Sequence, residues 1–142
     1  MHRSEALAHA ASELVGTPFR LQGRDLAHGL DCIGLVLASL AAVGVRIDLP
    51  ADYRPRQRSF TIPLEALHAA GLVQTAGARR AGDILLLRTA PAQLHTAIAA
   101  GHGDIVHAHA GLGKVVRAPL PDSWPILAAW RLDPDGDTLW QR

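Results

Sequence analysis

The sequence predicts an α+β domain, in which helices come first along the chain and an antiparallel sheet follows. Apolar residues recur at helical spacing in the first third of the 142 residues, whereas short strand-like runs separated by glycine or proline turns fill the part after residue 83. No internal repeat or low-complexity tract interrupts this order. A chain of this length suits one domain, so residues 1–142 are expected to form a single unit, with 133–142 as a loosely held tail.

Two helices joined by a loop are expected in the first part of the chain. Residues 4–15 carry alanine, leucine and valine at helical spacing, and a Gly-Thr-Pro run ends the pattern. Residues 16–31 hold three glycines, a proline and two aspartates, which is typical of a loop. A second, apolar helix is expected over residues 32–43, because Asp31 can cap its first turn and Gly44 can end it.

A polar, proline-punctuated stretch over residues 46–62 and a short helix over 63–71 precede the predicted sheet. The character of the chain changes after Gly82-Asp83, where apolar and β-branched runs alternate with turns that contain glycine or proline. Such runs, joined by short turns, predict an antiparallel meander. The expected strands are residues 84–88, 94–100, 104–110, 114–118 and 126–132.

Charge and composition exclude several classes of partner. The formal net charge of +1 supplies no broad positive surface for nucleic acid or an anionic membrane, and no apolar run is long enough to span a bilayer. The segment Met1–Glu5 leads straight into a helical pattern and lacks the layout of a secretory signal, so synthesis in the cytoplasm and delivery by another device are expected. The single cysteine cannot form an internal disulfide.

That cysteine, Cys32, stands at the predicted start of the second helix. Unpaired backbone N–H groups and the positive end of the helix dipole gather at such a position, and both favour a thiolate over a thiol. The position therefore predicts a thiol pKa below the usual value of about 8.5 and a nucleophilic sulfur. The alternative is a small buried residue that only begins a core helix.

A thiolate nucleophile needs a base, usually a histidine, and a third polar group that orients the imidazole. The chain has eight histidines. Five of them are set aside because they lie at the terminus, within predicted helices, in the loop before the cysteine or at an expected hairpin tip. These five are His2, His9, His28, His68 and His102.

The remaining histidines, His95, His107 and His109, are expected on one face of a hairpin, because side chains two residues apart in a strand share a face. If residue 99 pairs with 103, His95 lies opposite His107; if residue 100 pairs with 104, it lies opposite His109. Either register brings two imidazoles within reach of each other. The same three side chains could instead hold a zinc ion, although that interpretation leaves the cysteine without a role.

Five short motifs follow one another at defined spacing: Gly16-Thr17-Pro18-Phe19-Arg20-Leu21-Gln22-Gly23, Asp31-Cys32-Ile33-Gly34-Leu35-Val36, Gly82-Asp83-Ile84-Leu85-Leu86-Leu87, His95, and Ile105-Val106-His107-Ala108. Their order over residues 5–132 resembles the NlpC/P60 family of cysteine peptidases. The resemblance implies a papain-like α+β fold, in which the helix that begins at the nucleophile packs on an antiparallel sheet. It also implies Cys32 as nucleophile, His95 as base and His107 as the residue that orients the base, with no metal or cofactor.

Members of this family typically cut peptide bonds in bacterial cell-wall stem peptides, so a peptidoglycan stem peptide is the implied substrate. The run Gly23-Arg24-Asp25 before Gly29-Leu30-Asp31-Cys32 resembles a branch associated with phage tails or gene-transfer agents. That likeness implies tail-assembly proteins as partners and delivery to the cell wall by a tail-like apparatus. The alternatives are a structural or weakly active tail component and an acyl-transfer or amidase enzyme on the same fold.

Two residues are expected to line the substrate site. Phe19 stands where the family commonly has tyrosine, which keeps an aromatic wall and removes a hydroxyl group. Asp31 could cap the helix or present its carboxylate to a free amine of the peptide, and the missing hydroxyl at Phe19 favours capping. The backbone N–H of Cys32, at the helix start, is the expected oxyanion donor.

Overall fold

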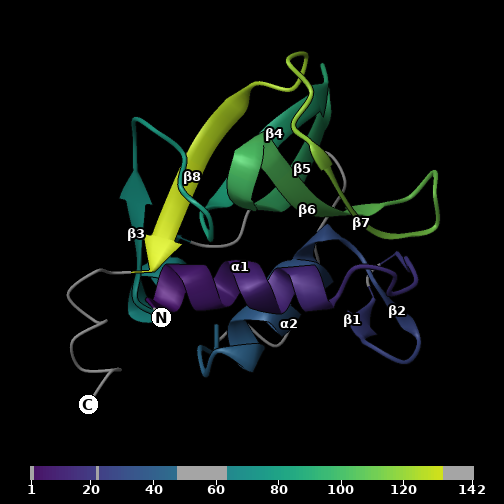
Figure 1. Ribbon diagram of the computed structural model, residues 1–142, viewed down its shortest axis with the longest axis horizontal. Helices are drawn as coiled ribbons and strands as arrows, with labels where there is room; N and C mark the ends of the chain where they lie inside the picture. The colour runs from purple at the N-terminus through teal and green to yellow at the C-terminus, as the bar shows by residue number, and fades with distance from the viewer. Residues whose placement is uncertain (1, 22, 48–63, 133–142) are drawn as a thin grey trace.

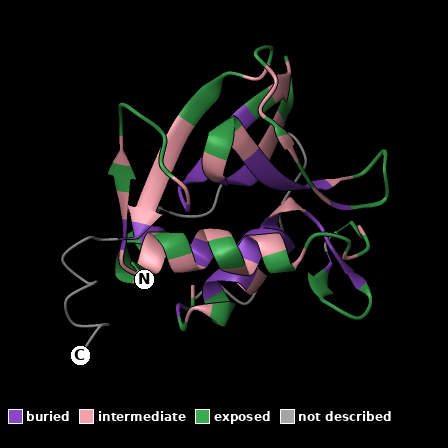
Figure 2. Cartoon of the chain, in the orientation of Figure 1, coloured by how far each residue is buried: buried purple, intermediate pink, exposed green. Residues whose placement is uncertain are grey.

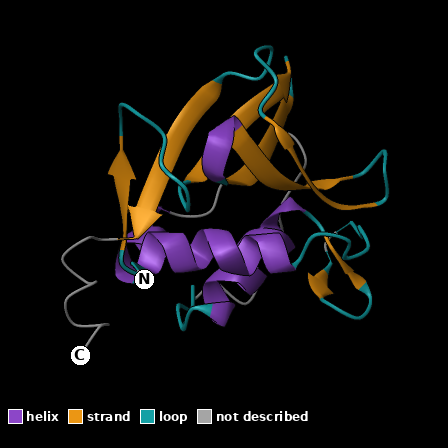
Figure 3. Cartoon of the chain, in the orientation of Figure 1, coloured by secondary structure: helices purple, strands orange, loops and turns teal. Residues whose placement is uncertain are grey.

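Helices α1 (Arg3–Glu13) and α2 (Cys32–Ala42) lie side by side against one face of an antiparallel sheet in the computed structural model of the chain (Figures 1 and 3). The structure describes residues 2–21, 23–47 and 64–132. The strands of the sheet are ordered across it as β3 (Leu72–Thr75), β8 (Ile126–Leu132), β4 (Ile84–Ala90), β5 (Gln93–Ala99), β6 (Asp104–His109) and β7 (Lys114–Pro119). The expected α+β class is confirmed. Within the part of the chain described, no helix is long and apolar enough to cross a membrane.

The five predicted strands are present, and each begins and ends within two residues of its expected bounds. A short helix, α3 (Leu64–Ala69), stands where one was predicted. Sequence reasoning missed β3 and a small hairpin of β1 (Arg24–Asp25) and β2 (Gly29–Leu30), because segments of two to four residues are too short for periodicity to show. The predicted tail and most of the polar stretch fall outside the described residues, in 133–142 and 48–63.

Both faces of the central strands are buried, and alternate residues face opposite sides. On the side of the helices, Ile84, Ile98 and Val106 pack with Leu7 and Leu35 in the main core. The smaller cluster on the other side consists of Leu85, Leu87, Ala97, Ala99 and Ile105, with Leu120, Trp124 and Ala129 packed against it. Figure 2 shows that α2 is largely buried, and six of its eleven residues have almost no exposed surface. Since each buried aliphatic side chain contributes about 1.5–3 kcal/mol, the core fixes where α2, and so its first residue, lies.

The Gly82-Asp83 motif joins three elements at the start of β4. Asp83 is 1% exposed, and its carboxylate accepts Nε of Arg131 at 2.8 Å, Nη2 of Arg131 at 2.9 Å and the N–H of Arg80 at 2.9 Å. This bidentate ion pair links β8 to the start of β4. Gly82 has φ +94°, and a Cβ atom there would collide with the carbonyl of Ser4 in α1. The motif therefore serves the fold.

Candidate active site

The carboxylate of Asp31 begins helix α2. Its Oδ1 atom accepts the backbone N–H groups of Ile33 at 3.1 Å and Gly34 at 2.8 Å, and the residue is 7% exposed. The expected cap is therefore confirmed. The same oxygen accepts Nη1 of Arg24 at 2.6 Å, and Nη1 also donates to the carbonyl of Gly23 at 2.9 Å. The cation that pairs with this carboxylate is therefore Arg24, a residue of the chain itself.

Close backbone contact holds the Arg24 hairpin against the first turn of α2. A Cβ atom at Gly34 would collide with the carbonyl oxygen of Gly23, and one at Gly23 would collide with the carbonyl of Gly29. Gly29 has φ +126°, a conformation that L side chains rarely adopt. These three glycines let β1 and β2 lie directly on the helix start.

Cys32 is the first residue of α2 and is partly buried. Burial raises the pKa of its thiol above the ordinary value; the backbone N–H and the hydroxyl of Thr96 oppose this rise, and the charge of Asp31 adds to it. The predicted lowering of this pKa is therefore wrong. Besides burial, the reason lies in the cap, because the N–H groups expected to stabilise a thiolate are bonded to Asp31 instead.

His95 and His107 form a hydrogen-bonded pair on the sheet. Nε2 of His95 lies 3.0 Å from Nδ1 of His107, and the rings meet edge to face with centroids 5.2 Å apart. His107 is only 3% exposed. Trp124 packs on both imidazoles, with ring centroids 5.9 Å from His95 and 5.5 Å from His107. The indole therefore shields the pair from water.

The register of the β5–β6 hairpin is the longer-loop alternative. The paired residues are Ile98 with Val106 and Ala99 with Ile105, which continue to a hydrogen bond from Ala100 to Asp104. The prediction attached to this register, that His95 would meet His109, is wrong, since His95 contacts His107. Strand pairing ends at Ile98, and beyond it the ring of His95 reaches a diagonal neighbour rather than the residue opposite.

The pKa of each imidazole is lowered to about 4, and burial is the main cause. The charges of His107 and His109 also lower the pKa of His95, and the charge of His109 also lowers that of His107. Both rings are therefore neutral at pH 7. The His109 ring lies 5.6 Å from that of His107, but its Nδ1 accepts the N–H of Leu112 at 3.0 Å, which holds the turn after β6. Among the described residues, no group of three His, Cys, Asp or Glu side chains is arranged to hold a metal ion.

Cys32 meets the sheet at Thr96, the neighbour of His95 in β5. The Thr96 hydroxyl donates to the carbonyl oxygen of Cys32 at 3.0 Å. Because successive strand residues face opposite sides, Thr96 points to α2 while His95 points to Trp124. Throughout the described ranges, no hydrogen bond joins the Cys32 sulfur to an imidazole.

Phe19 lies next to the start of α2 through its backbone. It forms a bridge with Leu30, the residue before Asp31, and its N–H donates to the carbonyl of Gly113 at 2.9 Å. Its half-buried ring packs against the main core. A substrate contact of Phe19, or of Asp31, stays a prediction.

Three residues of this site were missed by sequence reasoning: Arg24, Thr96 and Trp124. Arg24 lies seven residues before its partner Asp31, in a hairpin too short to show as strands. Trp124 precedes β8 and meets the imidazoles only through tertiary packing. Only Thr96 carried a local signal, because strand alternation turns the residue after His95 to the other face.

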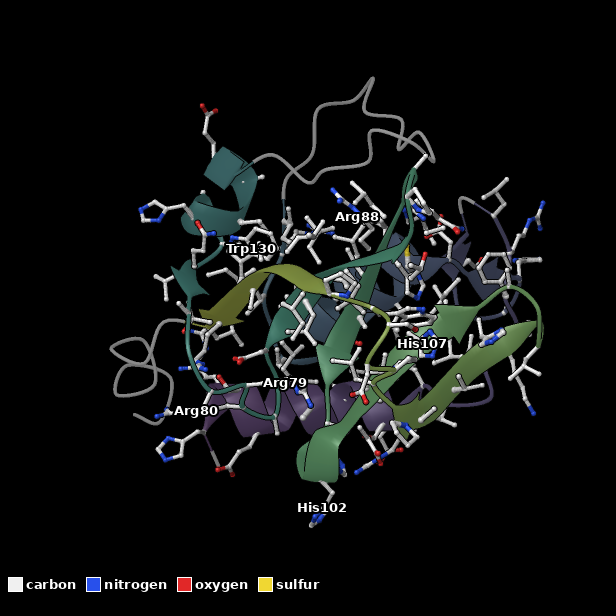
Figure 4. All side chains as sticks on the ribbon, turned by 90° about the horizontal axis from the view of Figure 1, so that it is seen from above. Arg79, Arg80, Arg88, His102, His107 and Trp130 are labelled. Carbon is white, nitrogen blue, oxygen red and sulfur yellow. The ribbon has the colours of Figure 1, made fainter. Side chains whose placement is uncertain are left out.

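Two other surface features, an exposed histidine and a hollow, lie away from the His95–His107 pair. Figure 4 shows His102 standing out at the end of its hairpin turn, away from His107, and the exposed tip expected for it is confirmed. A surface hollow runs along residues 75–79 and the adjoining parts of β4 and β8, and none of the candidate catalytic residues lines it.

Comparison with known proteins places the chain in a family. It matches the NlpC/P60 family over residues 16–124 and belongs to that family. Similar solved structures include NlpC1 from Trichomonas vaginalis (18% identity, TM-score 0.67) and the peptidoglycan hydrolase RipB from Mycobacterium tuberculosis (26%, 0.58). RipD from Mycobacterium tuberculosis, described as a non-catalytic NlpC/p60 domain protein adapted to peptidoglycan binding, is also similar (17%, 0.58).

The extent of these matches differs between the relatives. The alignments cover 92% of this chain and 44% of NlpC1, 92% of this chain and 65% of RipB, and 93% of this chain and 98% of RipD. The chain thus spans less than half the length of NlpC1. No curated protein sequence matches it. The expected NlpC/P60 fold is confirmed by the family match and by the structural likeness.

The lowered pKa values of the two imidazoles predict acid-sensitive stability. An unfolded histidine binds a proton near pH 6.5, whereas His95 and His107 in the fold do so only near pH 4. Their contribution to the free energy of unfolding is therefore complete above about pH 6.5 and declines as the pH falls to about 4. We expect a slope of up to about 1.4 kcal/mol per pH unit for each imidazole, measured by urea unfolding between pH 7 and 4.

Two variants separate this effect from general acid instability. His107→Asn removes one buried imidazole and should flatten the slope, whereas His102→Asn removes an exposed one and should leave it unchanged. Equal slopes in the wild type and His107→Asn would contradict the prediction.

Proposed function

We propose that this chain is a cysteine peptidase that hydrolyses an amide bond in the stem peptides of bacterial peptidoglycan. Cys32 is the nucleophile, His95 the base and His107 the residue that orients the base. The observation that carries the proposal is the part-buried His95–His107 hydrogen bond, because His95 lies in β5, the strand that also holds the backbone of Cys32. Membership of the NlpC/P60 family and the likeness to the hydrolase RipB support the substrate class.

The hydrogen bond between the imidazoles assigns a role to each ring nitrogen. Nε2 of His95 is hydrogen-bonded to Nδ1 of His107, which leaves Nδ1 of His95 as the nitrogen that can accept the thiol proton. For that nitrogen to be unprotonated in a neutral ring, Nε2 must carry the hydrogen and donate it to His107. His107 then carries its own hydrogen on Nε2.

The reaction begins from a neutral thiol and a neutral imidazole, because burial raises the pKa of Cys32 and lowers that of His95. Sγ attacks the amide carbon while the thiol proton moves to Nδ1 of His95. The imidazolium gives this proton to the leaving amine, the C–N bond breaks, and a thioester remains on Cys32. His95 then takes a proton from water, which attacks the thioester and releases the acid and the thiol.

Two features of Cys32 bear on these steps. Its sulfur is not hydrogen-bonded to His95 in the free protein, and catalytic hydrogen bonds commonly tighten only when substrate binds. Its backbone N–H, at the first position of α2, has no acceptor within the described part of the chain. That N–H is the oxyanion donor of the proposal, with a contribution of about 3 kcal/mol to the barrier.

A second function is favoured by the missing contact between the Cys32 sulfur and an imidazole. A chain that cannot form this contact would bind peptidoglycan without cutting it, as RipD is described to do. Such a chain would act as the wall-binding part of a larger assembly. The likeness of residues 23–32 to tail-associated relatives supports an assembly of the phage-tail kind and delivery by it.

Release of new amino groups from purified peptidoglycan tests the catalytic proposal. Cys32→Ala should abolish release, and His95→Ala should lower the rate by about 10²–10⁴-fold, because it removes the general base. His107→Asn should cost only about ten-fold, since asparagine can still accept the Nε2 hydrogen of His95. His102→Asn, at the exposed turn, should match the wild type.

The same samples distinguish the two functions. If wild type and Cys32→Ala both sediment with peptidoglycan and release equally little amine, the binding function is correct and the peptidase proposal is wrong. Release by the wild type that survives Cys32→Ala would also overturn it.

The ion pair between Arg24 and Asp31 predicts that the substrate needs no free N-terminal amine. Oδ1 of Asp31 already accepts Arg24 and the two N–H groups of the helix cap, and the residue is only 7% exposed, so the carboxylate has little surface to offer a substrate ammonium. We expect kcat/KM on a stem peptide to change by less than about two-fold when the peptide is acetylated. Arg24→Gln should create a preference of about ten-fold for the free amine. A strong preference in the wild type, unchanged in Arg24→Gln, would contradict this account.

A further inference from the structure

Thr96 joins the two halves of the candidate site but has no part in the reaction described above. It follows His95 in β5, is 4% exposed, and donates its hydroxyl to the carbonyl of Cys32 at 3.0 Å across 64 residues of sequence. A buried hydroxyl is unfavourable unless it is hydrogen-bonded. The bond to Cys32 satisfies that hydroxyl and fastens the first turn of α2 to the sheet.

The backbone around Thr96 shows why α2 meets β5 at this point. The N–H of Ala99 donates toward β4, to Asp83 at 2.8 Å, and the N–H of Ala100 donates toward β6, to Asp104 at 2.8 Å. Alternate N–H groups of a strand point to the same neighbour, so the N–H of Thr96 points toward β6. Pairing with β6 has already ended at Ile98. This unpaired edge is where the first residue of α2 lies.

The effect of Thr96 on the pKa of the Cys32 thiol agrees with this placement. Both the N–H and the hydroxyl of Thr96 act on the Cys32 thiol and favour its ionised form, against the effect of burial. A carbonyl oxygen in a helix has a second lone pair besides the one used within the helix, so Cys32 can accept the hydroxyl without loss of helix structure. Valine would fill the same volume without a donor.

We propose that Thr96 is a positioning residue, whose hydroxyl holds the backbone of Cys32 at the open edge of β5, one residue from His95. The proposal rests on the proposed function, because it takes Cys32 as the nucleophile. A carbonyl fixed in this way limits where Sγ of the same residue can stand relative to Nδ1 of His95. Misplacement of a reacting group by about 1 Å can cost about 10²-fold in rate.

Alkylation of Cys32 by iodoacetamide tests this proposal in the full chain without any need for hydrolysis. The rate is measured from pH 6 to 10 for the wild type, Thr96→Val and Thr96→Ser. Thr96→Val should shift the profile to higher pH and slow alkylation at pH 7.5 by about three- to ten-fold, because the hydroxyl that holds the Cys32 carbonyl and favours the thiolate is lost. Thr96→Ser keeps the hydroxyl and should stay within about two-fold of the wild type.

Thr75→Val is the matched control, because Thr75 lies in β3, at the far edge of the sheet from β7, and its hydroxyl donates to the carbonyl of the neighbouring Ala76. It should alkylate like the wild type. If Thr96→Val does not fold by circular dichroism, Thr96→Ala replaces it with the same expected result.

An unchanged or faster profile in the folded variant, or a Thr96→Ser profile that matches Thr96→Val, would overturn the proposal. A shifted profile in a protein that releases no amine from peptidoglycan would keep the positioning role and reject the peptidase function. The two failures are therefore distinguishable.

Discussion

The Oδ1 atom of Asp31 accepts donors from both sides of Cys32 in the chain, namely the N–H groups of Ile33 and Gly34 and the guanidinium of Arg24. The first N–H groups of any helix must find acceptors, and here a largely buried carboxylate supplies one. That carboxylate needs a cation, which brings the β1–β2 hairpin onto the helix start. The cap thus decides where α2 begins, where the hairpin lies, and that the thiol stands next to a negative charge.

Burial then shifts the pKa of the thiol and the pKa values of the imidazoles in opposite directions. It raises the pKa of Cys32 and lowers that of His95 and His107, so each group is neutral at rest. Three imidazoles within reach of one another would repel if charged, and Trp124 removes the water that would screen them. This charge state fits the proposed reaction, in which a proton moves during attack and no thiolate–imidazolium pair is stored.

Sequence patterns predicted the long elements and the cap at Asp31, because helical spacing, strand alternation and the aspartate before Cys32 are local signals. The sign of the thiol pKa shift could not be predicted, because it depends on burial and on which acceptor takes the helix N–H groups. Hairpin register also failed to give the partner of His95, since strand pairing stops short of that residue.

The roles of Arg24 and Thr96 lie in contacts that sequence distance hides. Arg24 reaches Asp31 because glycines at positions 23 and 29 allow a tight hairpin, and Thr96 reaches Cys32 across 64 residues. Neither contact leaves a periodic pattern in the sequence. The need for glycine at position 34 is likewise visible only in the fold, because the carbonyl oxygen of Gly23 occupies the space that a Cβ atom would fill.

The assignment of the base rests on one hydrogen atom, the one shared between His95 and His107. Nitrogen NMR of the ¹⁵N-labelled imidazoles at pH 7 observes it directly, with His95→Asn and His107→Asn variants to assign the signals. The account predicts that both rings are neutral and carry their hydrogen on Nε2, with Nδ1 of His95 unprotonated. A His95 ring protonated on Nδ1, whether neutral or charged, would contradict it.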